Sequence, residues 1–199
     1  MDIQYTDNRI IVSEKELTAL DQFVLDVITI LESITNYVIV SGYVTILFGR
    51  SRGTEDVDIL IPYLDEEAFR ALHRAFIQRG YEFLNAEGAG GLYDMLIHRM
   101  GIRFAKKDQF IPNIELKFLK DDVDRTVLQE RIEVCLTENS VFISPIEIQI
   151  AYKLYLGSEK DIEDALYLWE IFKDDLNLTG LKTWMKNLNV KRDEYGIGI

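Results

Sequence analysis

Two aspartates, Asp56 and Asp58, stand in the otherwise apolar segment Asp-Val-Asp-Ile-Leu-Ile (residues 56–61), directly after Gly-Arg-Ser-Arg-Gly-Thr-Glu (residues 49–55). The β-branched and apolar residues of this segment predict a buried strand. Side chains alternate along a strand, so both aspartates point to one face and the apolar residues between them point to the other. Because a carboxylate is costly to bury without a partner, the pair predicts a bound cation at this face.

Composition limits which partners the chain can have. Of its 199 residues, 48% are hydrophobic, enough to bury a sizeable core. The net charge of −12, from 22 basic and 34 acidic residues, opposes non-specific binding to nucleic acid. The single cysteine, Cys135, rules out a disulfide framework. No apolar run approaches the ~20 residues that span a bilayer, and the N-terminal residues lack a signal-peptide pattern, so we expect a cytoplasmic protein without membrane contact.

Apolar spacing predicts helices and strands that alternate up to about Phe142, followed by helices alone. The predicted strands span residues 37–40, 56–61, 81–84, 102–107 and 113–119. The predicted helices span residues 13–34 (with Ser13 as N-cap), 43–49, 65–80, 144–157, 158–174 and 178–189, while residues 90–100 fit either element. This order predicts an α/β or α+β fold, with a small mixed β-sheet core flanked by helices and a C-terminal helical bundle. We expect residues 1–142 to form the core, including the N-terminal helix, and residues 143–199 to pack on it as a helical region.

A glycine turn precedes the acid pair. The predicted strand 37–40 ends at Ser41-Gly42 and a short helix follows, so backbone N–H groups at the start of that helix can receive a phosphate. Asp56 and Asp58 together form a hard oxygen site that suits Mg²⁺ or Mn²⁺. Phosphate and metal groups are therefore expected side by side.

The stretch Val-Ser-Gly-Tyr-Val-Thr-Ile-Leu-Phe-Gly-Arg-Ser-Arg-Gly-Thr-Glu-Asp-Val-Asp-Ile-Leu-Ile (residues 40–61) resembles the nucleotidyltransferases of the DNA polymerase beta superfamily. Their signature is a Gly-Ser or Gly-Gly helix start followed by two acids one residue apart. More narrowly, the stretch resembles the AbiEii-type branch of abortive-infection toxins, in which an arginine and a small hydroxyl residue precede the acids, as Arg52 and Thr54 do here. A later segment, Ala-Tyr-Lys-Leu-Tyr-Leu-Gly-Ser-Glu-Lys-Asp-Ile-Glu-Asp-Ala (residues 151–165), is similar to the second motif of that branch. The matching residues of this segment are Lys153, Lys160, Asp161 and Asp164.

The resemblance implies a third carboxylate on an adjacent strand, which completes the metal site and activates the incoming hydroxyl. Glu115 is the candidate, with Asp94 as the alternative. The catalytic and metal-binding residues are then Asp56, Asp58 and Glu115. The implied nucleotide-binding residues are Ser41, Gly42, Tyr43, Arg52, Thr54, Lys153 and Asp164.

Tyr43 departs from the superfamily pattern, which has Ser or Gly directly after the first glycine. The phosphate contact then falls to the Tyr43 hydroxyl, to Ser41 or to backbone N–H groups. Three residues also have structural interpretations, which remain open: Glu115 in a cross-strand ion pair with a neighbouring lysine, Lys153 covering the core with its stem, and Asp161 in a helix cap with Ser158.

The resemblance implies a metal-dependent enzyme that moves a nucleoside monophosphate from an NTP such as ATP to a hydroxyl and releases pyrophosphate. The implied cofactor is Mg²⁺ or Mn²⁺, and the implied acceptor is a tRNA 3′ end, a protein hydroxyl or a small molecule such as an aminoglycoside. The branch implies a toxin with a cognate antitoxin as partner. Two alternatives stay open: a non-catalytic nucleotide- or metal-binding module that acts through a protein partner, and a helical interaction protein whose acids are merely solvated.

Overall fold

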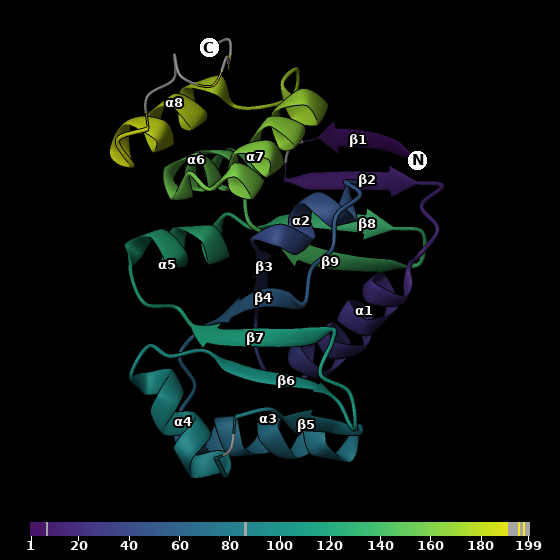
Figure 1. Ribbon diagram of the computed structural model, residues 1–199, viewed down its shortest axis with the longest axis vertical. Coiled ribbons are helices and arrows are strands. Elements are labelled where there is room, and N and C mark those ends of the chain that lie inside the picture. Colours follow the sequence, from purple (N-terminus) through teal and green to yellow (C-terminus); the bar gives the residue numbers. More distant parts are fainter. Residues whose placement is uncertain (7, 86, 191–194, 196, 198–199) are drawn as a thin grey trace.

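The strands of the computed structural model form a single mixed sheet (Figure 1). The structure describes residues 1–6, 8–85, 87–190, 195 and 197. The nine strands within these residues are β1 (Asp2–Thr6), β2 (Arg9–Ser13), β3 (Val38–Val40), β4 (Asp56–Ile61), β5 (Tyr81–Phe83), β6 (Ile102–Lys106), β7 (Asn113–Phe118), β8 (Ile132–Leu136) and β9 (Asn139–Ile143). Their order in the sheet is β1-β2-β8-β9-β3-β4-β7-β6-β5. The pairs β2·β8, β3·β9 and β4·β7 are parallel, and the other neighbours are antiparallel.

The helices gather at the two ends and on the faces of this sheet (Figure 1). In the described part of the chain they are α1 (Ala19–Glu32), α2 (Gly42–Leu47), α3 (Glu66–Gln78), α4 (Ala89–Ile97), α5 (Asp122–Gln129), α6 (Ile146–Leu156), α7 (Glu159–Phe172) and α8 (Leu178–Asn187). Helices α6, α7 and α8 form a group near β1 and β2, whereas α3 and α4 lie beside β5 and β6 (Figure 1). None of these helices has both the length and the apolar character that crossing a membrane requires.

One apolar cluster runs through the molecule from end to end. It includes Phe76 of α3 at one end, Ile59 of β4 in the middle and Phe172 of α7 at the other end, all of them buried. Since large apolar side chains are shared along this cluster, the C-terminal helices pack on the sheet rather than standing apart from it.

The predicted fold class is confirmed, because the molecule is a mixed sheet flanked by helices with a C-terminal helical group. Its nine described strands make the sheet larger than expected. The predicted division at residues 142 and 143 falls inside β9 and stays a prediction. Part of the predicted second region, residues 191–194, 196 and 198–199, lies outside the described residues.

The N-terminal part differs from the prediction. Ser13 is not a helix cap: it ends β2, and α1 begins six residues later at Ala19, with Thr18 as its N-cap. A capping box explains the later start, because the Thr18 hydroxyl accepts from the Asp21 N–H while the Asp21 carboxylate accepts from the Thr18 N–H. The strands β1, β2, β8 and β9 and the helix α5 were not predicted, and the ambiguous segment 90–100 contains most of α4.

Candidate active site

The two aspartates of β4 lie on one face of the sheet, as the alternation predicts. Val57 and Ile59 are fully buried on the opposite face. The Asp56 side chain is 36% exposed and that of Asp58 is 19% exposed. β4 lies between β3 and β7, so neighbouring strands support both edges and fix the direction of these carboxylates.

Glu115 of β7 lies directly beside Asp58. The two residues are partners in the parallel register of β4 and β7. The same row continues to Arg103 of β6, the register partner of Glu115, and to Val40 of β3, the partner of Asp58. The three carboxylates predicted to act together therefore share one face of neighbouring strands. Asp94, the alternative third acid, is exposed on α4 and is not part of this row.

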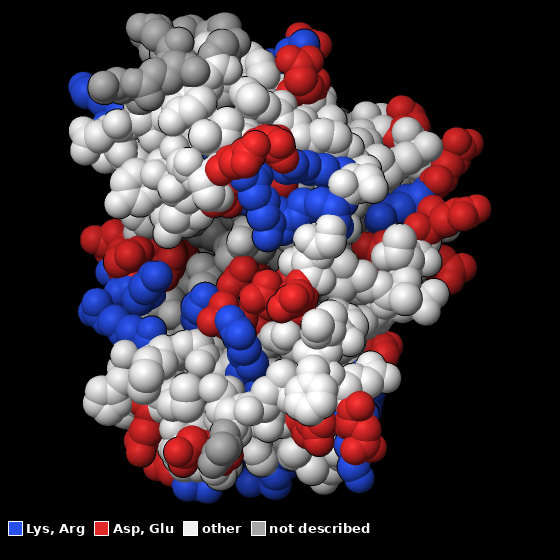
Figure 2. All heavy atoms as spheres, viewed as in Figure 1, with Lys and Arg blue, Asp and Glu red and all other residues white. Residues whose placement is uncertain are grey.

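Two cations lie among these carboxylates. Lys117 Nζ is 3.2 Å from Asp58 Oδ1 and 2.9 Å from Glu115 Oε2. Arg103 Nη2 is 3.6 Å from Asp56 Oδ2 and 3.8 Å from Glu115 Oε1. Figure 2 shows Asp and Glu atoms in the middle of this face, bordered by Lys and Arg atoms. Glu115 is thus paired with a lysine, but Lys117 belongs to the same strand, β7, whereas the cross-strand partner of Glu115 is Arg103.

The pKa values of Asp58 and Glu115 are shifted in opposite directions, although Lys117 acts to lower both. Burial raises the pKa of Asp58, and the neighbouring Glu115 adds to this, while Lys117 opposes both. Burial also acts to raise the pKa of Glu115, but Lys117, Asp58 and Arg103 together outweigh burial and the pKa is lowered. Negative charge is therefore concentrated here beyond what one ammonium neutralises.

The chemical type of these side chains, all carboxylates, suits a hard divalent cation. Three carboxylates on one face of two adjacent strands are the ligands that Mg²⁺ and Mn²⁺ prefer. Among the described residues, no three His, Cys, Asp or Glu side chains converge closely enough to hold a metal in the arrangement seen. Lys117 stands between Asp58 and Glu115, contacts one oxygen of each, and has a side chain that is 31% exposed.

The turn before α2 is strained at Ser41. This residue has φ 65° and ψ −138°, and its side chain makes no capping hydrogen bond to α2. A non-glycine residue at such a positive φ costs on the order of 1–3 kcal/mol, and such strain is concentrated at functional sites. Next to it, a β-carbon on Gly42 would lie 2.3 Å from Arg52 Nη2. Glycine is therefore needed here because a guanidinium packs against the backbone.

Tyr43 points away from this face, which corrects the interpretation of its hydroxyl as a phosphate contact. Its side chain is 1% exposed, and its hydroxyl donates to Asp21 Oδ1 of α1 at 2.7 Å. Asp21 also pairs with Lys15 Nζ at 3.0 Å. Tyr43 thus packs in the core, and Ser41 and the backbone N–H groups remain as the phosphate contacts expected at this turn.

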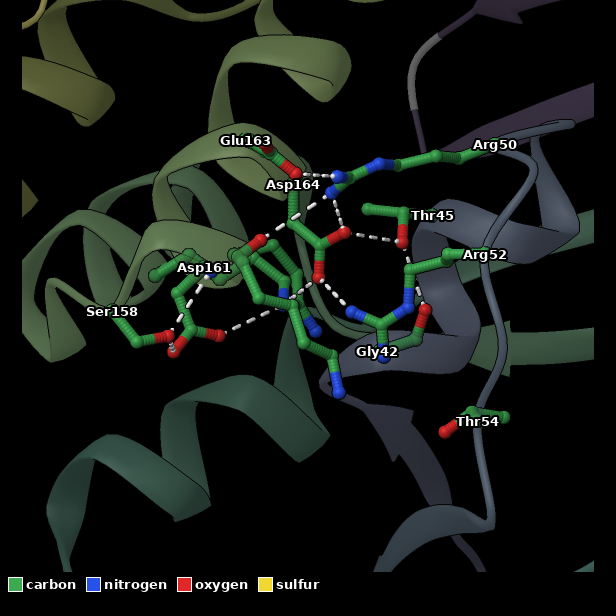
Figure 3. Close-up of polar contacts among 12 residues, drawn as sticks. Gly42, Thr45, Arg50, Arg52, Thr54, Ser158, Asp161, Glu163 and Asp164 are labelled. Atoms are coloured by element: carbon green, nitrogen blue, oxygen red, sulfur yellow. Dashed lines mark hydrogen bonds and ion pairs between the residues drawn. The ribbon is translucent and has the colours of Figure 1, made fainter.

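Asp164 of α7 is the centre of a buried group of cations (Figure 3). Its carboxylate is fully buried and accepts from Thr45 Oγ1 at 3.1 Å, Arg52 Nη1 at 2.7 Å and Lys153 Nζ at 2.7 Å, and from Arg50. Four protein donors enclose it, so the structure corrects its predicted role as a direct nucleotide contact. Asp164 instead holds three cations in place.

Lys153 does not reach water with its ammonium, as a lysine covering the core would. It is 2% exposed and is paired with Asp164 and, at 3.5 Å, with Asp161. Asp161 also takes part in the cap expected of it, because its N–H donates to the Ser158 hydroxyl at the start of α7. The Thr54 hydroxyl donates to the Asp56 carbonyl oxygen at 2.8 Å, so Thr54 shapes the loop that enters β4.

Arg50, Arg103 and Lys117 were missed as functional candidates. Arg50 donates from Nη2 to Glu163 Oε2 at 2.6 Å as well as contacting Asp164. Arg50 stands two residues before Arg52, and the structure shows that both pair with Asp164. Lys117 shares the face of Glu115 because side chains alternate along a strand, whereas Arg103 becomes visible only through the pairing of β6 with β7.

No family model and no curated protein sequence matches this chain. Among solved structures, a nucleotidyltransferase-like antigenic protein from Paracoccidioides brasiliensis is similar, with a TM-score of 0.53 and 19% identity over 89% of this chain and 91% of that one. The factor ANT(2'')-Ia in complex with adenylyl-2''-tobramycin is also similar, with a TM-score of 0.56 and 13% identity over 90% of this chain and 100% of that one. The solution structure of the same antibiotic-resistance factor gives a TM-score of 0.54 and 12% identity over 86% and 93% of the two chains. The fold is therefore nucleotidyltransferase-like.

Proposed function

We propose that this protein is a metal-dependent nucleotidyltransferase that moves a nucleoside monophosphate from an NTP to a hydroxyl and releases pyrophosphate. The observation that carries the proposal is the meeting of two features at one cavity, which Asp58 and Lys153 both line. One is the row of carboxylates, Asp56, Asp58 and Glu115, and the other is the buried cation group that includes Arg52 and Lys153. Carboxylates suit a divalent cation and buried cations suit phosphate oxygens, so the two features together match both parts of a metal-bound triphosphate.

Asp56, Asp58 and Glu115 would hold Mg²⁺ or Mn²⁺. A divalent cation bound there supplies positive charge to the reacting phosphate oxygens and orients them for in-line displacement. A cation held there would repel the Lys117 ammonium, which contacts one oxygen each of Asp58 and Glu115 and has a partly exposed side chain.

The chain's own residues then have separate roles. Glu115 accepts the proton of the acceptor hydroxyl, whose oxygen forms a bond to the α-phosphorus. The bond from the α-phosphorus to the bridging oxygen breaks, and its electron pair leaves with the pyrophosphate. Arg52 and Lys153 bind the oxygens of the leaving pyrophosphate, with Ser41 beside them, and Asp164 keeps both cations in position.

The test is label transfer from each α-³²P NTP with Mg²⁺ or Mn²⁺, together with pyrophosphate release. Acceptors would be total tRNA, cell extract and aminoglycosides, the last because the similar factor ANT(2'')-Ia was solved with adenylyl-2''-tobramycin. We expect labelled product from the wild type and none from Asp58→Asn. Asp94→Asn is the matched control, since Asp94 is exposed on α4, and it should transfer as the wild type does. Equal transfer of labelled nucleotide by the wild type and Asp58→Asn would refute the proposal.

One observation supports a second candidate, a non-catalytic nucleotide-binding module. Lys117 already pairs with Asp58 and Glu115, and the Arg52 guanidinium already packs on Gly42. Such contacts suit a site that binds a nucleotide without catalysing its transfer. A non-catalytic module should bind NTP tightly and release no pyrophosphate with Mg²⁺ or Mn²⁺. An enzyme should both bind NTP and release pyrophosphate.

The resemblance to the AbiEii-type branch extends the proposal to a toxin that modifies tRNA or protein and is neutralised by a cognate antitoxin. Growth arrest on expression of the wild type, absent in Asp58→Asn, would support this role. Normal growth with both, alongside transfer to an aminoglycoside, would instead assign a small-molecule acceptor.

A further inference from the structure

A cavity of about 230 Å³ lies beside the acid pair and extends beneath α5 and α6. Ser41, Asp58 and Lys153 line it on the side of the candidate site, so it is continuous with the place expected for the triphosphate. Leu60, Val127 and Ile148 line it farther in, and these three side chains belong to a separate small apolar cluster. The cavity thus has a charged end and an apolar end.

Its size limits what it can hold. Pockets that bury a whole small-molecule ligand measure roughly 300–1,000 Å³, and this one is smaller. It therefore has room for one ring system but not for a complete nucleotide. A ligand held here by one ring must place its remaining atoms at the charged end.

Two residues of α6 that line the cavity can contact a planar ring with polar groups on its edge, one by stacking and one by hydrogen bonding. Tyr152 is an aromatic side chain that is 41% exposed although it belongs to a helix whose other face is buried. Gln149 is 5% exposed, and its amide nitrogen donates to the Ser144 hydroxyl, also part of the lining. With that amide nitrogen engaged, the Gln149 carbonyl oxygen remains as an acceptor for a donor on a ring edge.

We propose that this cavity binds the nucleobase of the donor NTP, with Tyr152 stacked on the base and Gln149 contacting its edge. The inference rests on the proposed function, because it takes the triphosphate to lie on Arg52 and Lys153. It also names the residues that set base preference. A carbonyl acceptor at Gln149 favours a base with an amino group at the facing edge over one with a carbonyl there.

The test is equilibrium binding, by calorimetry with Mg²⁺, of the four NTPs and of inorganic tripolyphosphate to wild type and variants. Tyr152→Ala should weaken the preferred NTP by about 5- to 100-fold, the range for loss of base stacking, and leave tripolyphosphate binding unchanged. Tyr152→Phe keeps the ring and should stay near wild type. Tyr155→Ala is the matched control, since Tyr155 is the neighbouring exposed tyrosine of α6 and does not line the cavity.

A second variant fills the cavity from the opposite wall. Val127→Phe places a ring in the apolar end, which would then be too small for a nucleobase. It should weaken NTP binding by at least about tenfold and leave tripolyphosphate binding unchanged, because tripolyphosphate has no base. Gln149→Glu changes the acceptor to a charged one and should alter the ranking of the four NTPs.

The outcomes separate this inference from the proposed function. If Tyr152→Ala and Val127→Phe transfer nucleotide and bind NTP as the wild type does, the cavity does not hold the nucleobase. The proposed transferase activity would be unaffected by that result. A rise in the KM for the acceptor alone would overturn the base assignment too, because the cavity would then hold the acceptor. A wild type that binds neither NTP nor tripolyphosphate and transfers nothing would overturn both.

Discussion

Asp164→Asn should destabilise the protein by about 3–5 kcal/mol, the cost of removing one partner from a buried ion pair. The carboxylate is fully buried, and in the structure it accepts from Thr45, Arg50, Arg52 and Lys153. The amide of asparagine keeps the shape but not the charge. Three cations are then left close together with no enclosed counter-charge, which is why the value expected is that for a buried pair.

The assay is chemical and thermal unfolding of the wild type and Asp164→Asn at neutral pH. For a chain of this size each kcal/mol lowers Tm by roughly 2–4 °C, so a fall of about 6–20 °C is expected. Glu163→Gln is the matched control: Glu163 is the adjacent residue and also pairs with Arg50, but its side chain is 58% exposed. An exposed pair of this kind contributes at most about 1 kcal/mol. A loss in Asp164→Asn no larger than that in Glu163→Gln would refute the reasoning, because burial would then not be what makes Asp164 important.

Three further predictions concern the groups around the glycine turn. Tyr43→Phe should lower the free energy of unfolding by about 1–3 kcal/mol, because a buried carboxylate loses a donor, and calorimetry should find NTP affinity unchanged. Burial acts to raise the pKa of Asp21, but hydrogen bonds from Thr18, Tyr43 and Lys15 outweigh it and lower the pKa. The stability that Asp21 contributes is therefore present above its unfolded pKa, about 3.9, and lost as the pH falls through its folded pKa. Urea titrations should show the gap between wild type and Asp21→Asn constant down to about pH 4 and narrowing below. Gly42→Ala should displace the Arg52 guanidinium and weaken tripolyphosphate binding by about 10- to 100-fold, the value of one hydrogen bond to a charged group, with a smaller effect on Tm; unchanged binding would contradict the role of Arg52.

The acid row could be predicted because a strand has a period of two. Asp56, Asp58 and the strand of Glu115 follow from alternation alone, and the structure places Glu115 opposite Asp58. The pairing of β4 with β7 joins segments almost sixty residues apart, which alternation does not specify. Their catalytic role stays a prediction.

The direction of Tyr43 could not be predicted from its neighbours. In a short helix every position is close to the turn, and only the packing of α1 decides which side chains face inward. Asp21 provides a buried acceptor at 2.7 Å from the tyrosine hydroxyl, so Tyr43 is directed into the core. The missed elements have a similar cause: β2 and β8 are five-residue strands stabilised by pairing with each other, and their local patterns are too short to identify them.

The arrangement of charge would allow a chain with a net charge of −12 to bind the triphosphate that we propose as its ligand. Asp164 is buried behind Arg52 and Lys153, so it fixes these cations without facing the ligand. Asp58 and Glu115 face outward, and the partly exposed Lys117 lies against both. A free triphosphate would meet the exposed acids with the wrong sign, and a free metal ion would meet the cations. Under the proposed function, a triphosphate that carries its metal would complement both the acids and the cations, so we expect NTP affinity to depend steeply on Mg²⁺.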